Sequence, residues 1–316
     1  MRLGEHRGED RRADAGRESV SSRRMHPSTE KRALNGLACM ALAVLFFSFM
    51  NVCIKLLGAG IPVQETVFVR SAATIPIVLW MIRRRGLSPL GNSRKFLLLR
   101  GTFGTLGMLT YFACVGRLPL GNAILLTQAS PIFAAWFAAK FLHERPGRAL
   151  VIASTLCAIG LTLVARPTAD APIEWSVVAL LSCVLNGATY TIVRASSRQD
   201  HHLVVVFALP AVAAPVCAAL TAFHFVLPDA RQWLLLAGVT AASIVAQIFM
   251  TMGMQRETAG RATNMFFLGV ILNLGWGQLL GDPPIGHALL FGAALILSGV
   301  VVVALGKRVA PEPSVE

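Results

Sequence analysis

Polar side chains recur within long runs of this sequence that are otherwise apolar. Amide, phenol and indole groups donate or accept hydrogen bonds, and a few such groups in an apolar setting recognise polar organic solutes. The residues predicted to contact such a solute are Asn51, Tyr111, Gln128, Asn186, Tyr190, Gln247, Asn273 and Trp276. Taken singly, a residue of this kind more often packs or bonds between helices. The prediction of a solute site therefore rests on the recurrence of such residues along the chain.

Helical spacing places some of these residues on a common face. Asn186 and Tyr190 are one turn apart, and Asn273 and Trp276 are separated by three positions. A pore for ions would instead show rings of like charge or carbonyl filters. The pattern indicates a polar cavity with aromatic groups, suited to a small organic solute.

Two charged residues near the start of one apolar run indicate proton coupling or an ion pair. Glu65 is the only acid near the interior of a run, and it is the candidate proton carrier. Arg70 follows five residues later, which places the two side chains about 140° apart on a helix. Arg70 is therefore expected to bond a group on another helix or a carbonyl, with contact to solute as the alternative.

Proline at position 131 lies in a run that also holds hydrogen-bonding residues. Pro131 removes one helical hydrogen bond and frees the carbonyl of Thr127, four residues earlier. An unsatisfied carbonyl is costly in lipid, so this stretch is expected to face protein or a wet cavity. We assign Pro131 to a helix hinge on this basis.

Two stretches of the chain, from Leu142 to Ala165 and from Leu280 to Ala304, have similar sequences. Both copies open with an acid and a proline, and both continue with a small residue and a glycine seven positions later. The opening residues are Glu144, Pro146, Asp282 and Pro284, and the later pairs are Ala153 with Gly160 and Gly292 with Gly299. The shared order predicts an internal repeat whose opening residues form equivalent hinges.

The composition is that of a membrane protein. Of 316 residues, 55% are hydrophobic and 14% are charged, with a mean hydropathy of +0.63, whereas soluble domains carry about 25% charged residues. Nine of the 29 Lys and Arg lie in the first 32 residues, and most others lie between apolar runs. The net charge of +13 thus reflects the flanks of spans in a lipid bilayer, and nucleic acid is not an expected partner.

Ten apolar segments are each long enough to cross a bilayer core of about 30 Å as a helix. Their expected bounds are Leu34–Leu57, Thr66–Ile82, Leu97–Val115, Leu120–Phe141, Ala149–Ala165, Trp175–Val193, Leu203–Leu227, Trp233–Gly253, Thr258–Leu280 and Ile285–Leu305. Helices are required because lipid offers no partner to an unpaired backbone group, and the runs lack the alternation of a barrel. Residues 1–33 are expected to form a disordered basic tail.

Positive charge is distributed unequally over the gaps between these segments. Alternate gaps, together with the two tails, hold 24 Lys and Arg, and the other gaps hold three. The bias places both termini in the cytoplasm. Residues 34–165 and 174–306 each hold five spans, so the second repeat enters the membrane upside down, ahead of a short tail at 307–316. Such an inverted repeat is typical of secondary transporters that open a central site to either side in turn.

The repeated stretches resemble a known family. Residues 121–164 and 260–303 look like the ends of the two EamA domains of the drug/metabolite transporter superfamily, with Asp282 where the family usually has glutamate. The segment from Val63 through Arg70, and "LRG" at 99–101, are similar to the second and third helices of the first domain. The resemblance covers about residues 34–306 and implies ten helices in two inverted five-helix halves. It also implies a central cavity lined mostly by helices 1, 3, 4, 6, 8 and 9.

The expected function is secondary transport of a small organic metabolite, such as an amino acid, a nucleoside or an S-adenosyl compound, inward or outward by alternating access. The sequence contains no catalytic, metal-binding or nucleotide-binding motif, so no enzyme activity, cofactor or metal is expected. The alternatives are a membrane-embedded enzyme, which requires a cluster of His, Asp or Ser at one depth, and a non-transporting structural subunit. The expected location is the cell membrane as a multi-pass protein, which is the inner membrane in a Gram-negative source. Assembly into a homo-oligomer is left open.

Overall fold

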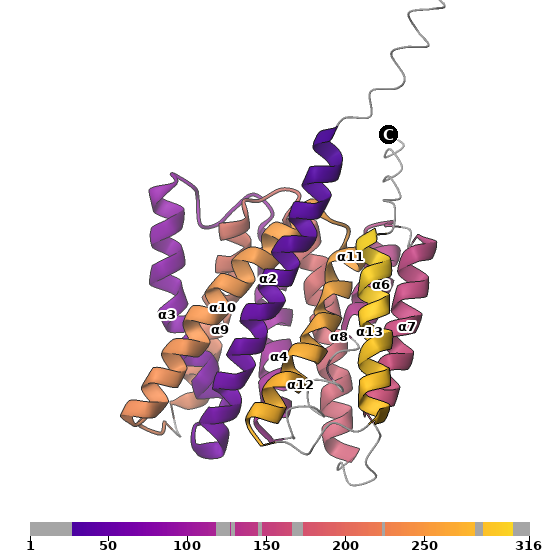
Figure 1. Ribbon diagram of the computed structural model, residues 1–316. Coiled ribbons are helices and arrows are strands. Elements are labelled where there is room, and N and C mark those ends of the chain that lie inside the picture. Colours follow the sequence, from indigo (N-terminus) through magenta and orange to yellow (C-terminus); the bar gives the residue numbers. More distant parts are fainter. Residues whose placement is uncertain are drawn as a thin grey trace, which may run out of the picture.

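The computed structural model describes residues 27–117, 127, 130–144, 147–165, 173–222, 225–281 and 287–305. Within those ranges every regular element is a helix and no strand occurs. The helices gather in one bundle, with the start of α2 and the end of α13 at the same end (Figure 1). The described chain is thus all-α, as expected of continuous apolar runs that must satisfy their own backbone hydrogen bonds.

The elements divide between the two predicted halves of the chain. The first half contains α2 (Pro27–Leu57), the 3-10 turn η1 (Gly58–Gly60), α3 (Val63–Arg84), α4 (Arg94–Arg117), α6 (Ser130–Phe141) and α7 (Arg148–Ala165). The second contains α8 (Ile173–Ser196), α9 (His202–Thr221), α10 (Ala230–Arg256), α11 (Ala259–Asn264), the 3-10 turn η2 (Met265–Phe267), α12 (Leu268–Leu279) and α13 (His287–Leu305).

Six of the described helices are long and apolar enough to cross a membrane: α2, α3, α4, α8, α9 and α10. The other expected spans correspond to α6, α7, α11 with α12, and α13, which are described as shorter helices. A total of ten spans therefore stays a prediction.

Helix bounds differ from those expected from sequence in several places, and the start of α2 and a break in the ninth expected span are two of them. Helix α2 begins at Pro27, before the expected start at Leu34. The segment expected as one helix from Thr258 to Leu280 contains a 3-10 turn, η2, which separates α11 from α12. A 3-10 stretch inside a helical run often marks a hinge. This break is therefore a place where the second half of the chain can bend.

Local sequence determines where helix α10 begins. At the start of α10, the Asp229 carboxylate accepts a hydrogen bond from the Gln232 backbone N–H at 2.7 Å. The Gln232 side-chain oxygen accepts in return from the Asp229 N–H at 2.8 Å. This reciprocal capping box satisfies two backbone donors that a helix start otherwise leaves free.

Helices from the two halves pack against each other in pairs. Helix α2 lies along α10, α4 along α8, α3 along α9, and α7 along α13. Helix α12 packs on α2, and α6 packs on α8. Each of these helices has a counterpart at the same place in the order of the other half. If every helix is replaced by its counterpart, each of these contacts becomes either itself or another contact of the set.

The two repeated stretches form the contact between α7 and α13. A side chain at Gly160 would meet the carbonyl oxygen of Gly292 at 2.6 Å, and one at Gly299 would meet that of Ala153 at 2.8 Å. Residues 153 to 160 of α7 therefore face residues 299 to 292 of α13, and the two helices run antiparallel. Ala153 and Gly160 of one copy thus contact Gly299 and Gly292 of the other. The contact is close because small residues allow the backbones to approach each other.

Candidate solute-binding site

A cavity of about 120 Å³ lies in the centre of the bundle. One water needs roughly 10–15 Å³ by this measure, so the space holds several waters or part of a solute. Its polar lining residues are Ser48, Asn51, Arg70, Arg100, Tyr111, Thr127, Ser130, Asn186, Thr189, Tyr190, Gln247 and Asn273. Both halves of the chain contribute, and we call this space the central cavity. Helices α3 and α9 also reach it, through Arg70 and Leu209, in addition to the helices that the family resemblance implied.

Most of the residues predicted to contact solute line the central cavity. Six of the eight do so: Asn51, Tyr111, Asn186, Tyr190, Gln247 and Asn273. Trp276 is not among the lining residues, and its indole N–H donates instead to the Ser48 hydroxyl at 3.3 Å. Gln128 lies outside the described residues, as do the predicted hinge residues Pro146, Asp282 and Pro284.

A chain of hydrogen bonds crosses the cavity from the first half to the second. The Tyr111 hydroxyl donates to Asn51 Oδ1 at 3.0 Å, and Asn51 Nδ2 donates to Asn273 Oδ1 at 3.3 Å. Asn273 Nδ2 donates in turn to the Gly269 carbonyl at 2.6 Å. The chain couples α4, α2 and α12, and it fixes which amide atoms face the cavity.

Other lining residues keep polar atoms without a partner. In the described part of the chain, Thr189 Oγ1, Gln247 Oε1 and Arg100 Nε are buried and make no hydrogen bond. Buried polar atoms of native proteins nearly always have partners, so these three are free to bond water or a solute. Asn186 differs, because its Nδ2 donates to the Gly107 carbonyl at 3.3 Å and thereby also helps to pack α8 on α4.

An aromatic pair forms one wall of the central cavity. The rings of Tyr190 on α8 and Phe266 in η2 stack with centroids 4.8 Å apart and an angle of 26° between their planes. Both residues line the cavity. The 3-10 turn that interrupts the ninth expected span is therefore in direct contact with the site, and bending there would reshape it.

Two arginines enter the central cavity, and sequence inspection identified only one of them. Arg70 donates from Nε to the Ser243 hydroxyl at 2.6 Å, a partner on another helix as its position relative to Glu65 predicts. Arg100 was counted with the positive residues between spans. It nevertheless lies inside the expected span Leu97–Val115, and in the structure it is buried within α4. The signal that could have identified it is Gly104, one turn later, which leaves room for the side chain to fold inward.

The hinge predicted at Pro131 lies at the cavity wall. Pro131 is in the first turn of α6 as described, and Ser130 and Thr127 both line the cavity. The Ser130 hydroxyl donates to the Thr127 carbonyl at 2.8 Å. The carbonyl that proline would leave free is therefore satisfied by a side chain, which is a common way to accommodate proline in membrane helices.

Comparison with known proteins identifies the family. A model of the EamA-like transporter family matches residues 34–166. The pseudopaline exporter CntI of Pseudomonas aeruginosa (strain UCBPP-PA14) is 30% identical over 276 residues, which are 87% of this chain and 97% of the exporter. The chain belongs to the EamA-like transporter family.

Two further comparisons extend the likeness along the chain. A riboflavin transporter of Rhizobium johnstonii is 29% identical over 276 residues, covering 84% of this chain and 90% of that protein. A solved crystal structure superimposes with a TM-score of 0.69 at 20% identity, covering 84% of this chain and 95% of the other, which shows a common fold. The EamA protein is therefore a multi-pass membrane transporter of small metabolites, and its named relatives are transporters rather than enzymes.

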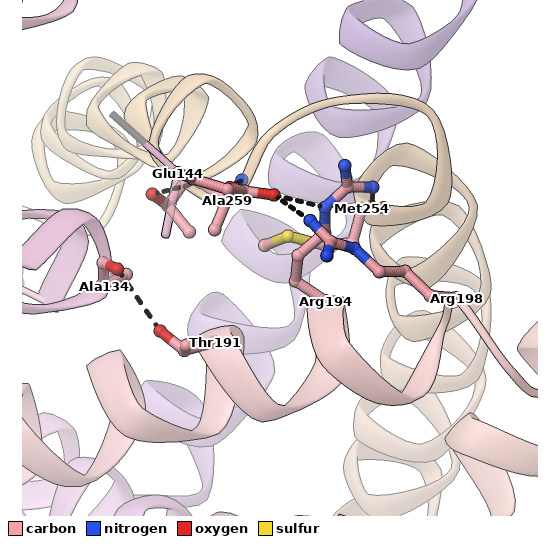
Figure 2. A network of polar contacts seen from close by, with 8 residues as sticks. Ala134, Glu144, Thr191, Arg194, Arg198, Met254 and Ala259 are labelled. Atoms are coloured by element: carbon pink, nitrogen blue, oxygen red, sulfur yellow. Dashed lines mark hydrogen bonds and ion pairs between the residues drawn. The ribbon is translucent and has the colours of Figure 1, made fainter. Parts of the chain in front are cut away.

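The EamA protein has a network of charged groups at one end of the bundle, centred on Glu144 (Figure 2). Glu144 Oε1 accepts from Arg194 Nε at 3.1 Å and from Arg198 Nη2 at 2.6 Å, and Oε2 accepts from the Ala259 N–H at 2.9 Å. Arg194 Nη1 also donates to the Met254 carbonyl at 2.6 Å. We call these groups the Glu144 cluster. It joins the segment after α6 to the ends of α8 and α10 and to the start of α11.

A second polar contact lies between the same ends of neighbouring helices. Asp200 Oδ1 accepts from the Asn92 N–H at 2.6 Å, and Asp200 Oδ2 accepts from both the N–H and the hydroxyl of Ser93. Gln255 Nε2 donates to the Asp200 carbonyl at 3.2 Å. The connection from α3 to α4 is thereby held to the connection from α8 to α9 and to α10.

Glu65 lies apart from the residues that line the central cavity. Its side chain is fully buried, and Oε2 accepts from the Val226 N–H at 3.0 Å. The other carboxylate oxygen, Oε1, is buried without a hydrogen-bond partner in the described part of the chain. The contact joins the start of α3 to the segment before α10, and it leaves one oxygen able to carry a proton.

Proposed function

We propose that the EamA protein moves a small polar organic metabolite across the cell membrane by alternating access through the central cavity. The observation that carries this proposal is the collection of buried polar atoms with no hydrogen-bond partner among the described residues, around one cavity to which both halves contribute. Such a site binds a solute that is largely desolvated, with a few hydrogen bonds to set its orientation.

The architecture proposed for this transport is ten spans in two inverted five-helix repeats, residues 34–165 and 174–306, with both termini in the cytoplasm. The reciprocal contact of Gly160 and Gly299 at the α7–α13 interface supports the repeat, because a two-fold operation brings equivalent residues of two related units together in this way. The pairing of α2 with α10 and of α4 with α8 supports it as well. Related halves can exchange conformations, which opens the central site to either side in turn.

The Glu144 cluster is proposed to be a closing contact at the cytoplasmic end. The charge distribution places the end of α8 in the cytoplasm, where Arg194 and Arg198 lie. Opening the cavity toward this side requires α8, α10 and α11 to separate, and therefore requires the hydrogen bonds of Glu144 to break. The hinge role expected of Glu144 from sequence stays a prediction beside this proposed role in closure.

Proteoliposomes test the proposed transport directly. The purified protein would be reconstituted in liposomes, and the liposomes would be loaded with labelled amino acids, nucleosides, S-adenosyl compounds or riboflavin. Riboflavin is included because one relative is a riboflavin transporter. Saturable exchange of at least one compound, in either direction, is the expected result. Protein that is folded and reconstituted but exchanges none of them would overturn the proposal.

Proton coupling through Glu65 is a separate prediction. Glu65→Gln is expected to abolish the pH dependence of transport and to leave solute exchange intact, because the carboxamide oxygen can still accept from the Val226 N–H but the group cannot release a proton. The measurement is initial uptake rate against pH in proteoliposomes. Glu174→Gln, a change at an exposed acid in α8, is the matched control. A pH profile of Glu65→Gln that equals the unmodified one would contradict the coupling role.

A further inference from the structure

The charge of the central cavity has one sign. Arg70 and Arg100 line it, and neither an acidic residue nor a lysine does so in the part of the chain that the structure describes. Each arginine is only 4% exposed. We propose that the transported solute is a small organic oxyanion, bound through its carboxylate or phosphate group by Arg70 and Arg100. This inference rests on the proposed transport function and names the substrate class of the same cavity.

Among the residues that the structure describes, the contacts of Arg70 leave its charge uncompensated. Its guanidinium donates to the Ser243 hydroxyl and contacts the Met108 sulfur, and both partners are neutral. Glu65, on the same helix, directs its bonded oxygen to the Val226 N–H instead. Arg70 is therefore held in position by groups that do not neutralise it.

Arg100 also lines the cavity. Its Nε is buried and makes no hydrogen bond in the described part of the chain. A side chain at Gly104 would meet Arg100 Nη1 at 2.5 Å, so the guanidinium lies over this glycine, one turn further into the membrane. Gly104 also lines the cavity. The absence of a side chain at position 104 is what allows the guanidinium to reach the site.

Two buried positive charges that line one cavity favour an anionic guest. Guanidinium stays charged under physiological conditions, and burying such a charge without a partner is costly. An oxyanion accepts two parallel hydrogen bonds from one guanidinium, which gives both strength and direction. Of the solute classes expected from sequence, amino acids and S-adenosyl compounds carry a carboxylate, and nucleosides carry no oxyanion. The cavity therefore favours the first two over the third.

Binding can be tested without transport by thermal unfolding of the full-length protein in detergent at constant ionic strength. The probes are succinate, glycerol 3-phosphate and succinamide, the last being a neutral analogue of succinate. We expect at least one of the two anions to raise the melting temperature in a saturable manner, and succinamide to leave it unchanged. The anion that acts distinguishes a carboxylate from a phosphate site. An equal shift with succinamide, or no shift with either anion, would overturn the proposal.

Variants locate the effect at the two arginines. Arg100→Gln and Arg70→Gln are expected to raise the anion concentration needed for half of the shift by at least about tenfold, since each removes a charged hydrogen-bond donor. Arg84→Gln, at the cytoplasmic end of α3 where the guanidinium lies 5.2 Å from the Trp80 ring, is the matched control and should respond as the unmodified protein. Arginine variants that respond in the same way as Arg84→Gln would contradict the assignment.

A third variant distinguishes loss of anion binding from loss of folding. Gly104→Ala keeps both charges and displaces the Arg100 guanidinium, because the new methyl group would meet Arg100 Nη1 at 2.5 Å and Leu209 Cδ1 at 2.7 Å, both at the ends of flexible side chains. It is expected to weaken the anion response while the melting temperature without ligand stays close to the unmodified value. An unchanged anion response of Gly104→Ala would count against Arg100 as a contact.

The inference and the transport function fail in different ways. Exchange of neutral solutes in proteoliposomes, with no competition by the anions, would refute the substrate class and leave transport standing. Saturable anion binding in detergent, without exchange of any labelled solute, would leave the site standing and refute transport.

Discussion

Glu144→Ala is expected to destabilise the protein by about 3–5 kcal/mol, the usual cost of removing one partner of a buried ion pair. The Glu144 side chain is 10% exposed and that of Arg194 is 14% exposed, so the substitution leaves a mostly buried guanidinium without its acid. The Ala259 N–H loses its acceptor as well. Arg198 contributes little, because its side chain is 48% exposed and solvent screens the pair. Denaturant unfolding in detergent measures the change.

Matched variants separate the buried pair from its exposed neighbour. Arg198→Ala should cost less than about 1 kcal/mol, as exposed pairs do. Glu144→Gln should fall between, since its oxygen can still accept from the Ala259 N–H while the charge is lost. The double variant Glu144→Met with Arg194→Met should recover most of the stability lost by Glu144→Ala, because the only charge it leaves without Glu144 is the exposed Arg198. Equal losses for Glu144→Ala and Arg198→Ala would contradict the role given to the cluster.

Gly299→Leu is expected to prevent correct folding. A Cβ atom at this position would meet the Cys157 sulfur at 2.5 Å and the Ala153 carbonyl oxygen at 2.8 Å. The second atom belongs to the backbone of α7 and cannot yield by a rotamer change, so the helices must separate. The expected result is loss of the monodisperse peak in size-exclusion chromatography and a large fall in melting temperature.

The reciprocal change and a control complete this test. Gly160→Leu should have a comparable effect, because it would meet the Gly292 carbonyl oxygen at 2.6 Å. Gly275→Leu makes the same substitution in α12 where nothing lies within 4 Å, and it should fold normally. Normal folding of both Gly160→Leu and Gly299→Leu would refute the close contact of the two repeated stretches.

The helical fold and much of the cavity could be predicted from sequence because lipid restricts the choices. Apolar runs of membrane length must be helical, and polar residues such as Asn51 and Gln247 within them have few alternatives to facing protein or a cavity. The paired small residues, Ala153 with Gly160 and Gly292 with Gly299, marked the repeat, but their contact with each other across α7 and α13 was not predicted.

What escaped prediction depends on contacts between distant segments. Arg100 looked like a flanking charge because it lies near the start of its expected span, Leu97–Val115, and the sequence does not show that Gly104 leaves room beside it. The bonds of Glu144 were not predicted, because its partners Arg194 and Ala259 lie 50 and 115 residues away. The break of the ninth expected span at η2 has no proline to signal it.

The most direct test of passage through the central cavity is to fill it and measure exchange. Thr189 on α8 lines the cavity with an unpartnered hydroxyl, and Val177 on the same helix is 63% exposed. The assay is exchange of a labelled solute in proteoliposomes, for Thr189→Trp and Val177→Trp matched in melting temperature. We predict that Thr189→Trp reduces the exchange rate at least about tenfold, because the indole occupies the site, whereas Val177→Trp leaves it unchanged. Exchange by Thr189→Trp at the unmodified rate would contradict transport through this cavity.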